Sequence, residues 1–216
     1  MVRSPESPAA PRVSPPDVPD VLTPAEPARR ADLLQSRLAL TGDVDLAHAT
    51  LEQCELSVDA GTVDLTGADL LDVEIIGVRA ASVGLRDAGI RRLRVRGGRI
   101  GTLDLSTTRI GELELRDLHI DYLNLGAAKG TDLLFADSTI RTLDMPQAQL
   151  TRVRFDECRS DEVDPRGLRA TDVDLRGLDA MSFTDANSLR GVTLTGFQVQ
   201  QLAPVLAAGV GIRVRD

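Results

Sequence analysis

Residues 93–125 read LRVRGGRIGTLDLSTTRIGELELRDLHIDYLNL, and a large apolar residue recurs in this stretch every five positions. Over residues 63–157, the series that runs from Leu65 through Leu70 to Phe155 is Leu, Ile, Val, Met or Phe at 17 of its 19 positions. The series two residues earlier, from Val63 to Val153, is large and apolar at 12 positions and small at the other seven. The chain therefore repeats with a period of five.

This period fits neither an α-helix, which repeats about every 3.6 residues, nor a single amphipathic strand, which repeats every two. Within each unit the two apolar residues are separated by one polar residue, as in a minimal strand with two side chains facing inward. The two residues that follow are mostly Gly, Asp, Arg, Ser or Thr, which favour a corner. Repetition of this unit predicts a solenoid whose strands pair with those of the neighbouring coils.

The number of sides follows from a second pattern. Between residues 93 and 153 the earlier inward position alternates large and small side chains, with Leu118 as the exception. A ten-residue alternation needs an even number of sides, and four sides of five residues give a coil of about twenty residues with a closely packed core. The three-sided hexapeptide solenoid needs a period of six and is excluded.

Several segments resemble the pentapeptide-repeat family, whose unit is a small residue, Asp or Asn, Leu or Phe, and two polar residues. Ala68-Asp69-Leu70 fits this unit directly, and three others fit it loosely: Val63-Asp64-Leu65, Val44-Asp45-Leu46 and Val173-Asp174-Leu175. The resemblance covers residues 43–199. It implies an all-β fold, a right-handed quadrilateral parallel β-helix of about eight coils.

The chain departs from the family pattern in three ways. Leu is unusually frequent at the small position. The register loses one residue between Leu56 and Val63 and another between Phe183 and Leu189. The main series also weakens around residues 156–172, where we expect a distorted or loop-bearing coil.

The segments outside the repeat have separate roles. Residues 1–30 hold eight of the eleven prolines and no apolar stripe, which predicts a disordered, Pro-rich tail. Residues 31–42 are expected to cap the N-terminal end of the rod, and residues 200–216 the C-terminal end.

A short helix is expected over residues 195–208, which leads from the repeat into this cap and bears Leu202, Val205 and Leu206. A last strand would follow at Ile212 and Val214. Similar C-terminal segments in the family cap the rod or join two rods end to end. A homodimer through this segment therefore stays open.

Catalytic and metal-binding constellations are not recognisable in the chain. His48 and His119 lie about three and a half coils apart, and Cys54 and Cys158 occupy small inward positions, where cysteine acts as a compact apolar residue. The glycine cluster at 97–101 is better explained by corners than by phosphate binding. We therefore expect no enzymatic activity, no cofactor and no metal.

Charge is arranged in bands along the expected rod. Residues 43–77 carry nine acidic and no basic side chains, whereas residues 78–99 carry seven arginines and one aspartate. The candidate partner-binding acids are Asp45, Glu52, Glu55, Asp59, Asp64, Asp69, Asp72 and Glu74, joined by Glu112, Glu114, Asp117 and Asp121. The candidate partner-binding arginines are Arg91, Arg92, Arg94, Arg96 and Arg99.

Two functions fit these features. The first is a non-catalytic rod that acts as a rigid protein-binding scaffold, with the arginines docking an acidic partner. The alternative, implied by the resemblance, is a mimic of duplex DNA that binds DNA gyrase and inhibits it or protects it from quinolones, with carboxylates in place of phosphates. Acids continuous along one face would favour mimicry, and coils ringed by mixed charge would favour the scaffold.

Other partners are not expected. Direct nucleic-acid binding through the arginines would have to overcome a net charge of −8, and only 2% of the residues are aromatic and able to stack on bases. No apolar run is long enough to cross a bilayer, and no secretory apolar region follows Met1. These features predict a cytoplasmic protein.

Overall fold

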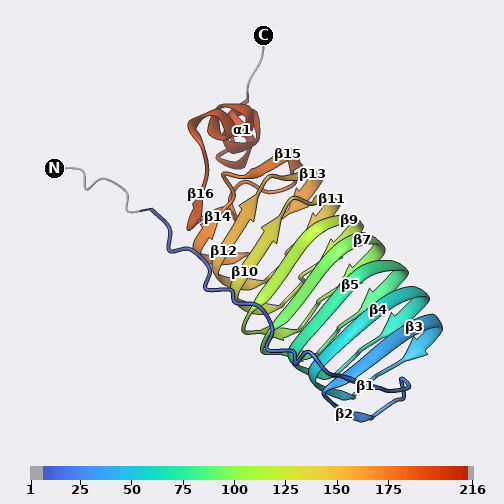
Figure 1. Ribbon diagram of the computed structural model, residues 1–216. Helices are drawn as coiled ribbons and strands as arrows, with labels where there is room; N and C mark the ends of the chain where they lie inside the picture. Colours follow the sequence, from blue (N-terminus) through green and yellow to red (C-terminus); the bar gives the residue numbers. More distant parts are fainter. Residues whose placement is uncertain (1–6, 214–216) are drawn as a thin grey trace.

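The computed structural model describes residues 7–213, which form a rod of stacked β coils that ends in a single helix (Figure 1). None of these residues belongs to a helix that is long and apolar enough to cross a membrane. The strands are β1 (Thr23–Pro24), β2 (Asp32–Leu34), β3 (Ser36–Asp45), β4 (Thr50–Asp64), β5 (Asp69–Gly84), β6 (Gly89–Ile90), β7 (Leu93–Asp104), β8 (Arg109–Ile110), β9 (Leu113–Asn124), β10 (Lys129–Ala136), β11 (Thr139–Asp144), β12 (Gln149–Asp156), β13 (Cys158–Asp164), β14 (Arg169–Asp174), β15 (Leu178–Phe183) and β16 (Val192–Thr193). The helix is α1 (Gly196–Gly209).

The coil contains twenty residues through most of the rod. Lys129 lies opposite Arg109 in one neighbouring coil and opposite Gln149 in the other, and every pairing is parallel. At five residues per side, a coil of twenty has four sides. A left-handed corner recurs at the same interval, for example at Asp87 and Thr107, which both have φ of 58°. These observations confirm the predicted parallel β-helix.

The core is built from the two inward series. All nineteen positions of the series from Leu65 to Phe155 are buried, and so are those of the series from Val63 to Val153 except Gly98. Phe135 and Phe155 stack in neighbouring coils, with ring centroids 4.4 Å apart and an interplanar angle of 6°. The five-residue period therefore marks the residues that fill the rod.

Both predicted register slips are confirmed. The first coil is short, because Leu33 lies opposite Leu51, eighteen residues away. The spacing becomes nineteen between Gly42 and Asp43, and it reaches twenty at the predicted slip, between Ser57 and Asp59. Near the other end, Val173 lies opposite Val192, which gives a coil of nineteen residues.

The expected distortion over residues 156–172 is wrong. Thr139 lies opposite Arg159, and Cys158 opposite Leu178, so the twenty-residue register continues through this coil. Ser160 replaces a large apolar residue at the inward position, where it is buried and its Oγ donates to the carbonyl of Glu162 at 3.0 Å. The hydrogen bond satisfies the hydroxyl, so a polar residue fits the core without breaking the coil.

The N-terminal predictions need two corrections. Residues 7–30 are not disordered, because residues 7–22 lie extended along the side of the rod, β1 pairs with β3, and residues 29–30 form a turn before β2 (Figure 1). The rod supplies hydrogen-bond partners that the isolated segment lacks, as described below. Residues 31–42 are not a separate cap, because they form β2 and part of β3 in the first coil, with Leu38 and Leu40 continuing the buried series. Residues 1–6 lie outside the described residues.

The predicted C-terminal helix is confirmed as α1. Thr195 caps its N-terminus by accepting from the backbone N–H of Gln198 at 3.1 Å. The Gln198 side chain donates to the carbonyls of Leu175 and Leu178, at 2.8 and 2.9 Å, and so covers polar groups of the last coil. Leu202 is buried against the rod.

Other parts of the cap differ from expectation. Val205 is half-buried and Leu206 is exposed, so they contribute less to capping than Leu202. The expected last strand is absent at Ile212, which is 59% exposed, and Val214 lies outside the described residues.

Candidate protein-binding surfaces

One side of the rod carries a column of acidic and basic side chains at intervals of twenty residues. We call Asp72, Arg92, Glu112, Asp132 and Arg152 the charge column. The Arg92 Nη1 lies 2.6 Å from an Asp72 oxygen, and its Nε lies 3.6 Å from Glu112. Arg152 holds Asp132 through two hydrogen bonds of 2.6 and 2.7 Å. Charges of neighbouring coils thus neutralise one another.

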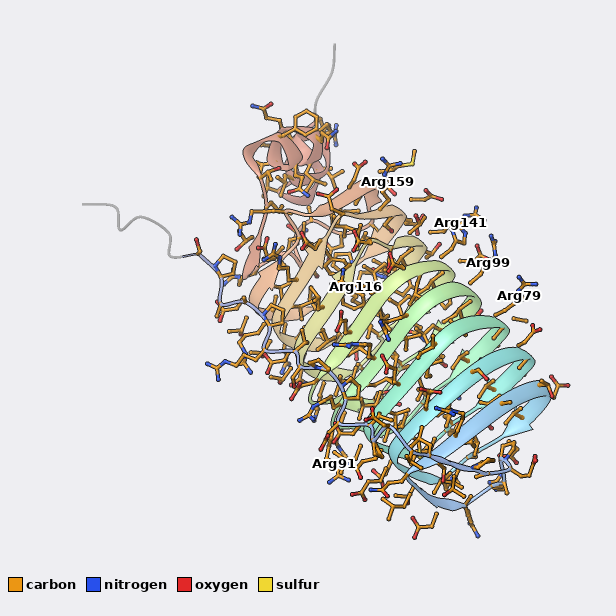
Figure 2. All side chains as sticks on the ribbon, in the orientation of Figure 1. Arg79, Arg91, Arg99, Arg116, Arg141 and Arg159 are labelled. Atoms are coloured by element: carbon orange, nitrogen blue, oxygen red, sulfur yellow. The ribbon has the colours of Figure 1, made fainter. Side chains whose placement is uncertain are left out.

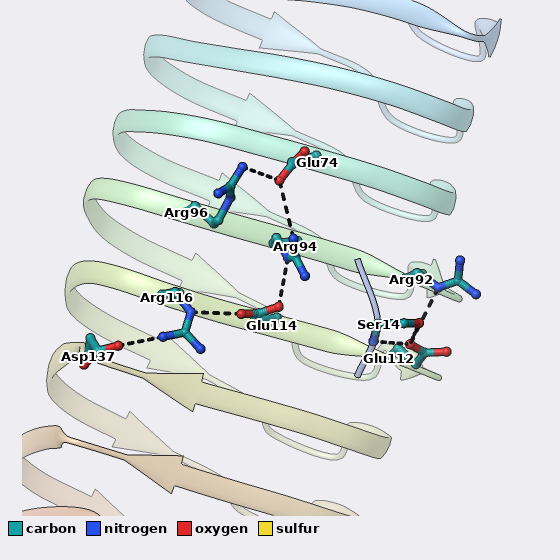
Figure 3. A network of polar contacts seen from close by, with 9 residues as sticks. All are labelled: Ser14, Glu74, Arg92, Arg94, Arg96, Glu112, Glu114, Arg116 and Asp137. Atoms are coloured by element: carbon teal, nitrogen blue, oxygen red, sulfur yellow. Dashed lines mark hydrogen bonds and ion pairs between the residues drawn. The ribbon is translucent and has the colours of Figure 1, made fainter. Parts of the chain in front are cut away.

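A second set of ion pairs lies beside this column (Figure 3). Arg94 donates to Glu114 at 2.8 Å and lies 3.9 Å from Glu74, which also pairs with Arg96 at 2.8 Å. Arg116 joins the set, 2.9 Å from Glu114. Because the Arg94, Glu74 and Glu114 side chains are at most 17% exposed, the set forms part of the packed surface of the rod.

These pairs shift the pKa values of their members. The hydrogen bonds from Arg152 hold the pKa of Asp132 below its usual range, although partial burial acts in the opposite direction. In the second set, the hydrogen bond to Glu114 raises the pKa of the Arg116 guanidinium. Asp132 and Arg116 therefore carry their charges at neutral pH.

The candidate arginines are mostly engaged within the rod. Arg92, Arg94 and Arg96 pair with the acids described above, and Arg99 pairs with Asp121 at 3.0 Å. Arg91 is the member of the predicted set for which the described residues provide no ion pair. Four of the five candidate arginines therefore bind acids of their own or neighbouring coils, and the binding of a partner by these five arginines stays a prediction.

Arg91 belongs to a different basic surface, which we call the basic corner: Arg91, Arg109 and Lys129. Arg109 and Lys129 lie opposite each other in adjacent coils, and the three residues line an open hollow of about 500 Å³ with Asp69. All three are exposed, and none forms an ion pair with any residue from 7 to 213. Their charges are therefore available to a partner.

Four further arginines project from an edge away from Arg91: Arg79, Arg99, Arg141 and Arg159 (Figure 2). Two of them have acidic partners, because Arg99 binds Asp121 and Arg141 lies 3.4 Å from Asp161. This edge carries mixed charge, unlike the basic corner.

Acidic residues gather at another corner. We call Asp45, Asp64, Asp104, Asp144 and Asp164 the acidic corner; they share one register line, on which Gly84 and Asn124 occupy the intervening positions. Asp64 accepts from the backbone N–H of Thr66 at 2.9 Å, an Asx turn that shapes the corner. Hydrogen bonding by the Thr66 side chain, and secondly by its backbone, lowers the Asp64 pKa. The carboxylates thus have a structural role as well as a charge.

The other candidate acids are distributed over several sides. Asp72 and Glu74 take part in the ion pairs, and Asp69 lines the basic corner. Glu55 pairs with Arg37 at 2.7 Å, whereas Glu52, three residues earlier in β4, is exposed. The band of nine acids predicted over residues 43–77 therefore does not form one continuous face.

The two histidines and the two cysteines have different surroundings. His48 occupies an exposed left-handed corner with φ of 58°, and His119 lies 3.3 Å from Asp121. Cys54 and Cys158 are buried free thiols, and burial raises the pKa of each. Across residues 7–213, no group of three His, Cys, Asp or Glu residues has a geometry that could hold a metal ion.

Sequence reasoning missed Arg109, Lys129 and the N-terminal contacts with the rod. The twenty-residue coil offered a signal for the first two, since residues that differ by twenty lie side by side. No comparable signal exists for the N-terminal segment.

No protein-family profile and no curated protein sequence matches the chain. Two solved structures of QnrB1, described as a plasmid-mediated fluoroquinolone resistance protein, are similar to it over 86% and 91% of this chain and 99% of theirs. Their sequence identities are 16% and 15%, and their TM-scores are 0.25 and 0.22, which are too low to support an argument. The five-residue repeat and the coil of twenty residues are observed in the chain itself and show a parallel β-helix, which is consistent with the pentapeptide-repeat resemblance.

Proposed function

We propose that the chain is a non-catalytic, cytoplasmic rod that binds an acidic segment of a protein partner at the basic corner. The observation that carries this proposal is the contrast between the basic corner and the charge column. Arg92 is neutralised by Asp72 and Glu112, whereas Arg109 and Lys129 are exposed and unpaired within the described part of the chain.

The rod gives this surface a fixed shape. Arg109 and Lys129 lie on β8 and β10, which are hydrogen-bonded to each other and rest on buried Ile110 and neighbouring core residues. Two cations on adjacent coils are about 4.8 Å apart at their backbones. An extended acidic segment that runs along the rod could therefore place successive carboxylates on Arg91, Arg109 and Lys129.

Site-specific crosslinking tests the proposal. A photo-crosslinking amino acid at Thr131, an outward position of β10 near Lys129, is expected to capture a partner in cells of the source organism. The triple variant R91E/R109E/K129E should lose that product. The matched control R79E/R159E, which reverses two exposed arginines on the other edge, should retain it.

Two results would contradict the proposal. One is a crosslinked product that survives reversal of all three charges. The other is equal loss of the product in the control variant, which would indicate a general charge effect. Since the contacts are exposed, added salt should also weaken the genuine complex.

The second candidate function is mimicry of duplex DNA toward DNA gyrase, and the acidic corner favours it. Asp64, Asp104 and Asp164 all have lowered pKa values and are therefore ionised at neutral pH. A line of carboxylates along a rigid rod can oppose basic groups arranged for phosphates. Two ion pairs argue against this function, because Arg86 pairs with Asp104 and Arg166 pairs with Asp164, which neutralises part of the acidic corner.

A supercoiling titration with purified gyrase, with and without a quinolone, tests this candidate. Inhibition or quinolone protection that is lost in D64K/D104K/D144K and kept in a D161K control would support mimicry through the acidic corner. The absence of any effect at tens of micromolar protein would exclude it and leave the scaffold function untouched.

A further inference from the structure

The N-terminal segment lies across the charge column as an extended strap. We call residues 7–22 the strap; it runs along the side of the rod, across coils that are far from it in sequence (Figure 1). Its contacts follow the chain in order: residue 12 meets residue 132, residue 14 meets residue 112, and residue 17 meets residue 72. The strap therefore follows the column toward the N-terminal end of the rod.

The strap is held chiefly through its backbone. The N–H of Arg12 donates to Asp132 at 2.9 Å, and the N–H of Asp17 donates to Asp72 at 2.9 Å. Both the N–H and the hydroxyl of Ser14 donate to Glu112, at 3.1 and 2.9 Å. Hydrogen bonds to ionised acceptors are among the stronger ones, so three short contacts can hold a long segment.

The position of these donors matches the charge pattern. Arg92 lies between Asp72 and Glu112 in the column, and Arg152 follows Asp132. Between Glu112 and Asp132 the column has no cation. The strap supplies N–H groups to both carboxylates at this step (Figure 3 shows Ser14 on Glu112). The strap thus places hydrogen-bond donors beside two neighbouring carboxylates of the same charge.

The acceptors are positioned by the rod itself. Arg152 fixes Asp132 and Arg92 fixes Asp72 through ion pairs of 2.6 Å. Neither arginine belongs to the strap. The hydrogen-bonding surface therefore does not depend on the strap for its geometry.

Recognition of the strap depends little on particular charged side chains. Arg12 and Asp17 are exposed, and no ion pair joins either of them to another described residue. The half-buried residues of the strap are aliphatic or proline: Pro8, Pro11, Val13, Pro16, Val18, Pro19 and Leu22. What the rod recognises is an extended backbone with prolines and aliphatic side chains on its inner side and free N–H groups between them.

We propose that the charge column is a recognition surface for extended, proline-rich peptide segments, and that the strap is its resident occupant. A partner segment with the chemistry of residues 7–20 would bind the same acceptors after it displaces the strap. Proline favours this mode of binding, because a polyproline-like chain is already extended and loses little entropy on docking. This surface is distinct from the basic corner and does not rest on the function proposed above.

The attached strap competes strongly with any such partner. A tethered segment acts at an effective concentration in the millimolar range for a short linker. The surface is therefore closed to weak ligands while the strap is in place and becomes available when the strap is cut or withdrawn.

Peptide binding to the nicked chain tests the proposal. A protease site inserted at Val21, which is 85% exposed, allows the full chain to be folded first and the strap to be cut and dialysed away. A fluorescent peptide of residues 7–20 is then titrated, with fluorescence anisotropy as the readout. We expect saturable binding to the nicked chain and at least tenfold weaker apparent binding to the uncut chain.

Two peptide variants separate specific recognition from nonspecific adhesion, and neither alters the rod. S14P removes the N–H and the hydroxyl that bind Glu112, and it should weaken binding roughly tenfold. A10P introduces the same residue at an exposed position, and it should change binding less than twofold. Equal affinities for the two variants, or no binding of the parent peptide up to millimolar concentration, would overturn the proposal.

Hydrogen exchange on the uncut chain gives an independent measurement. The amides of Arg12, Ser14 and Asp17 should exchange more slowly than those of Ala9 and Ala10, which have no hydrogen-bond acceptor in the described structure. Exchange of all five amides at the rate of an unstructured peptide would refute strap docking, whether or not the nicked chain remains folded.

Discussion

Gly97 and Gly98 lie side by side in a corner of β7, yet alanine at the two positions should have very different effects. Gly97 has φ of 69°, and a Cβ atom there would meet nothing within 4 Å. Gly98 has φ of 130°, and a Cβ atom would lie 1.9 Å from the carbonyl oxygen of Val78 in the preceding coil. The pair provides its own matched control.

The expected magnitudes follow from this geometry. Gly97→Ala requires a left-handed conformation without a clash, which costs about 1–2 kcal/mol. Gly98→Ala places alanine in a region used almost only by glycine, at about 1–3 kcal/mol, and also forces the backbone of two paired coils apart. Because Val78 and Leu118 both pair with Gly98, we expect a total loss of at least about 4 kcal/mol.

Urea unfolding followed by far-ultraviolet circular dichroism measures both variants, since the chain has no tryptophan to report on unfolding. The difference in free energy of unfolding between the two should exceed about 2 kcal/mol. A difference below about 0.5 kcal/mol would refute the reasoning, because it would mean that the coils separate at this corner without cost.

Three further predictions concern single side chains. The hydrogen bond to Asp144 raises the pKa of Tyr122 to about 12, so ultraviolet titration of this single tyrosine should show a late transition that D144N moves toward 10. The stability linked to Tyr122 is present below its unfolded pKa of about 10 and is lost as the pH rises toward 12, so wild type but not D144N should lose stability in that window. The thiols of Cys54 and Cys158 should not react with a thiol reagent in the native state at pH 8, and both should react in denaturant; fast native reaction would show that the coils open. An end-on homodimer through α1 would cover Phe197, which is 68% exposed, so Phe197→Ser should shift the mass measured by light scattering toward the monomer, and a wild-type protein that is monomeric at every concentration would contradict the dimer.

The sequence predicts the fold because the core repeats. Each inward residue, such as Leu65 or Leu70, appears in a five-residue series that no other regular structure explains, so the solenoid and its register slips follow directly. The coil around Ser160 was mispredicted because a hydroxyl can replace an apolar side chain when it finds a hydrogen-bond partner inside the core.

The candidate surfaces were harder to predict, because ion pairs depend on the coil length and not on the period of five. Arg92 is separated from Asp72 and Glu112 by twenty residues, and only a fixed twenty-residue register brings them together. Arginines that form one band in the sequence are therefore divided among separate ion pairs in the structure. The strap escaped prediction for a related reason: its composition indicates disorder, and its partners are carboxylates more than fifty residues away.

The strap also sets an order of events during synthesis. Residues 12–17 leave the ribosome before the rod is made, and Asp132 becomes available only after more than a hundred further residues have been synthesised. The early coils can stack on one another as they emerge, while the strap must wait until the sixth or so coil has formed, by roughly twenty residues per coil. A docked strap therefore marks a chain whose central coils are already in register, and an undocked one leaves its prolines accessible to proteases and chaperones during translation.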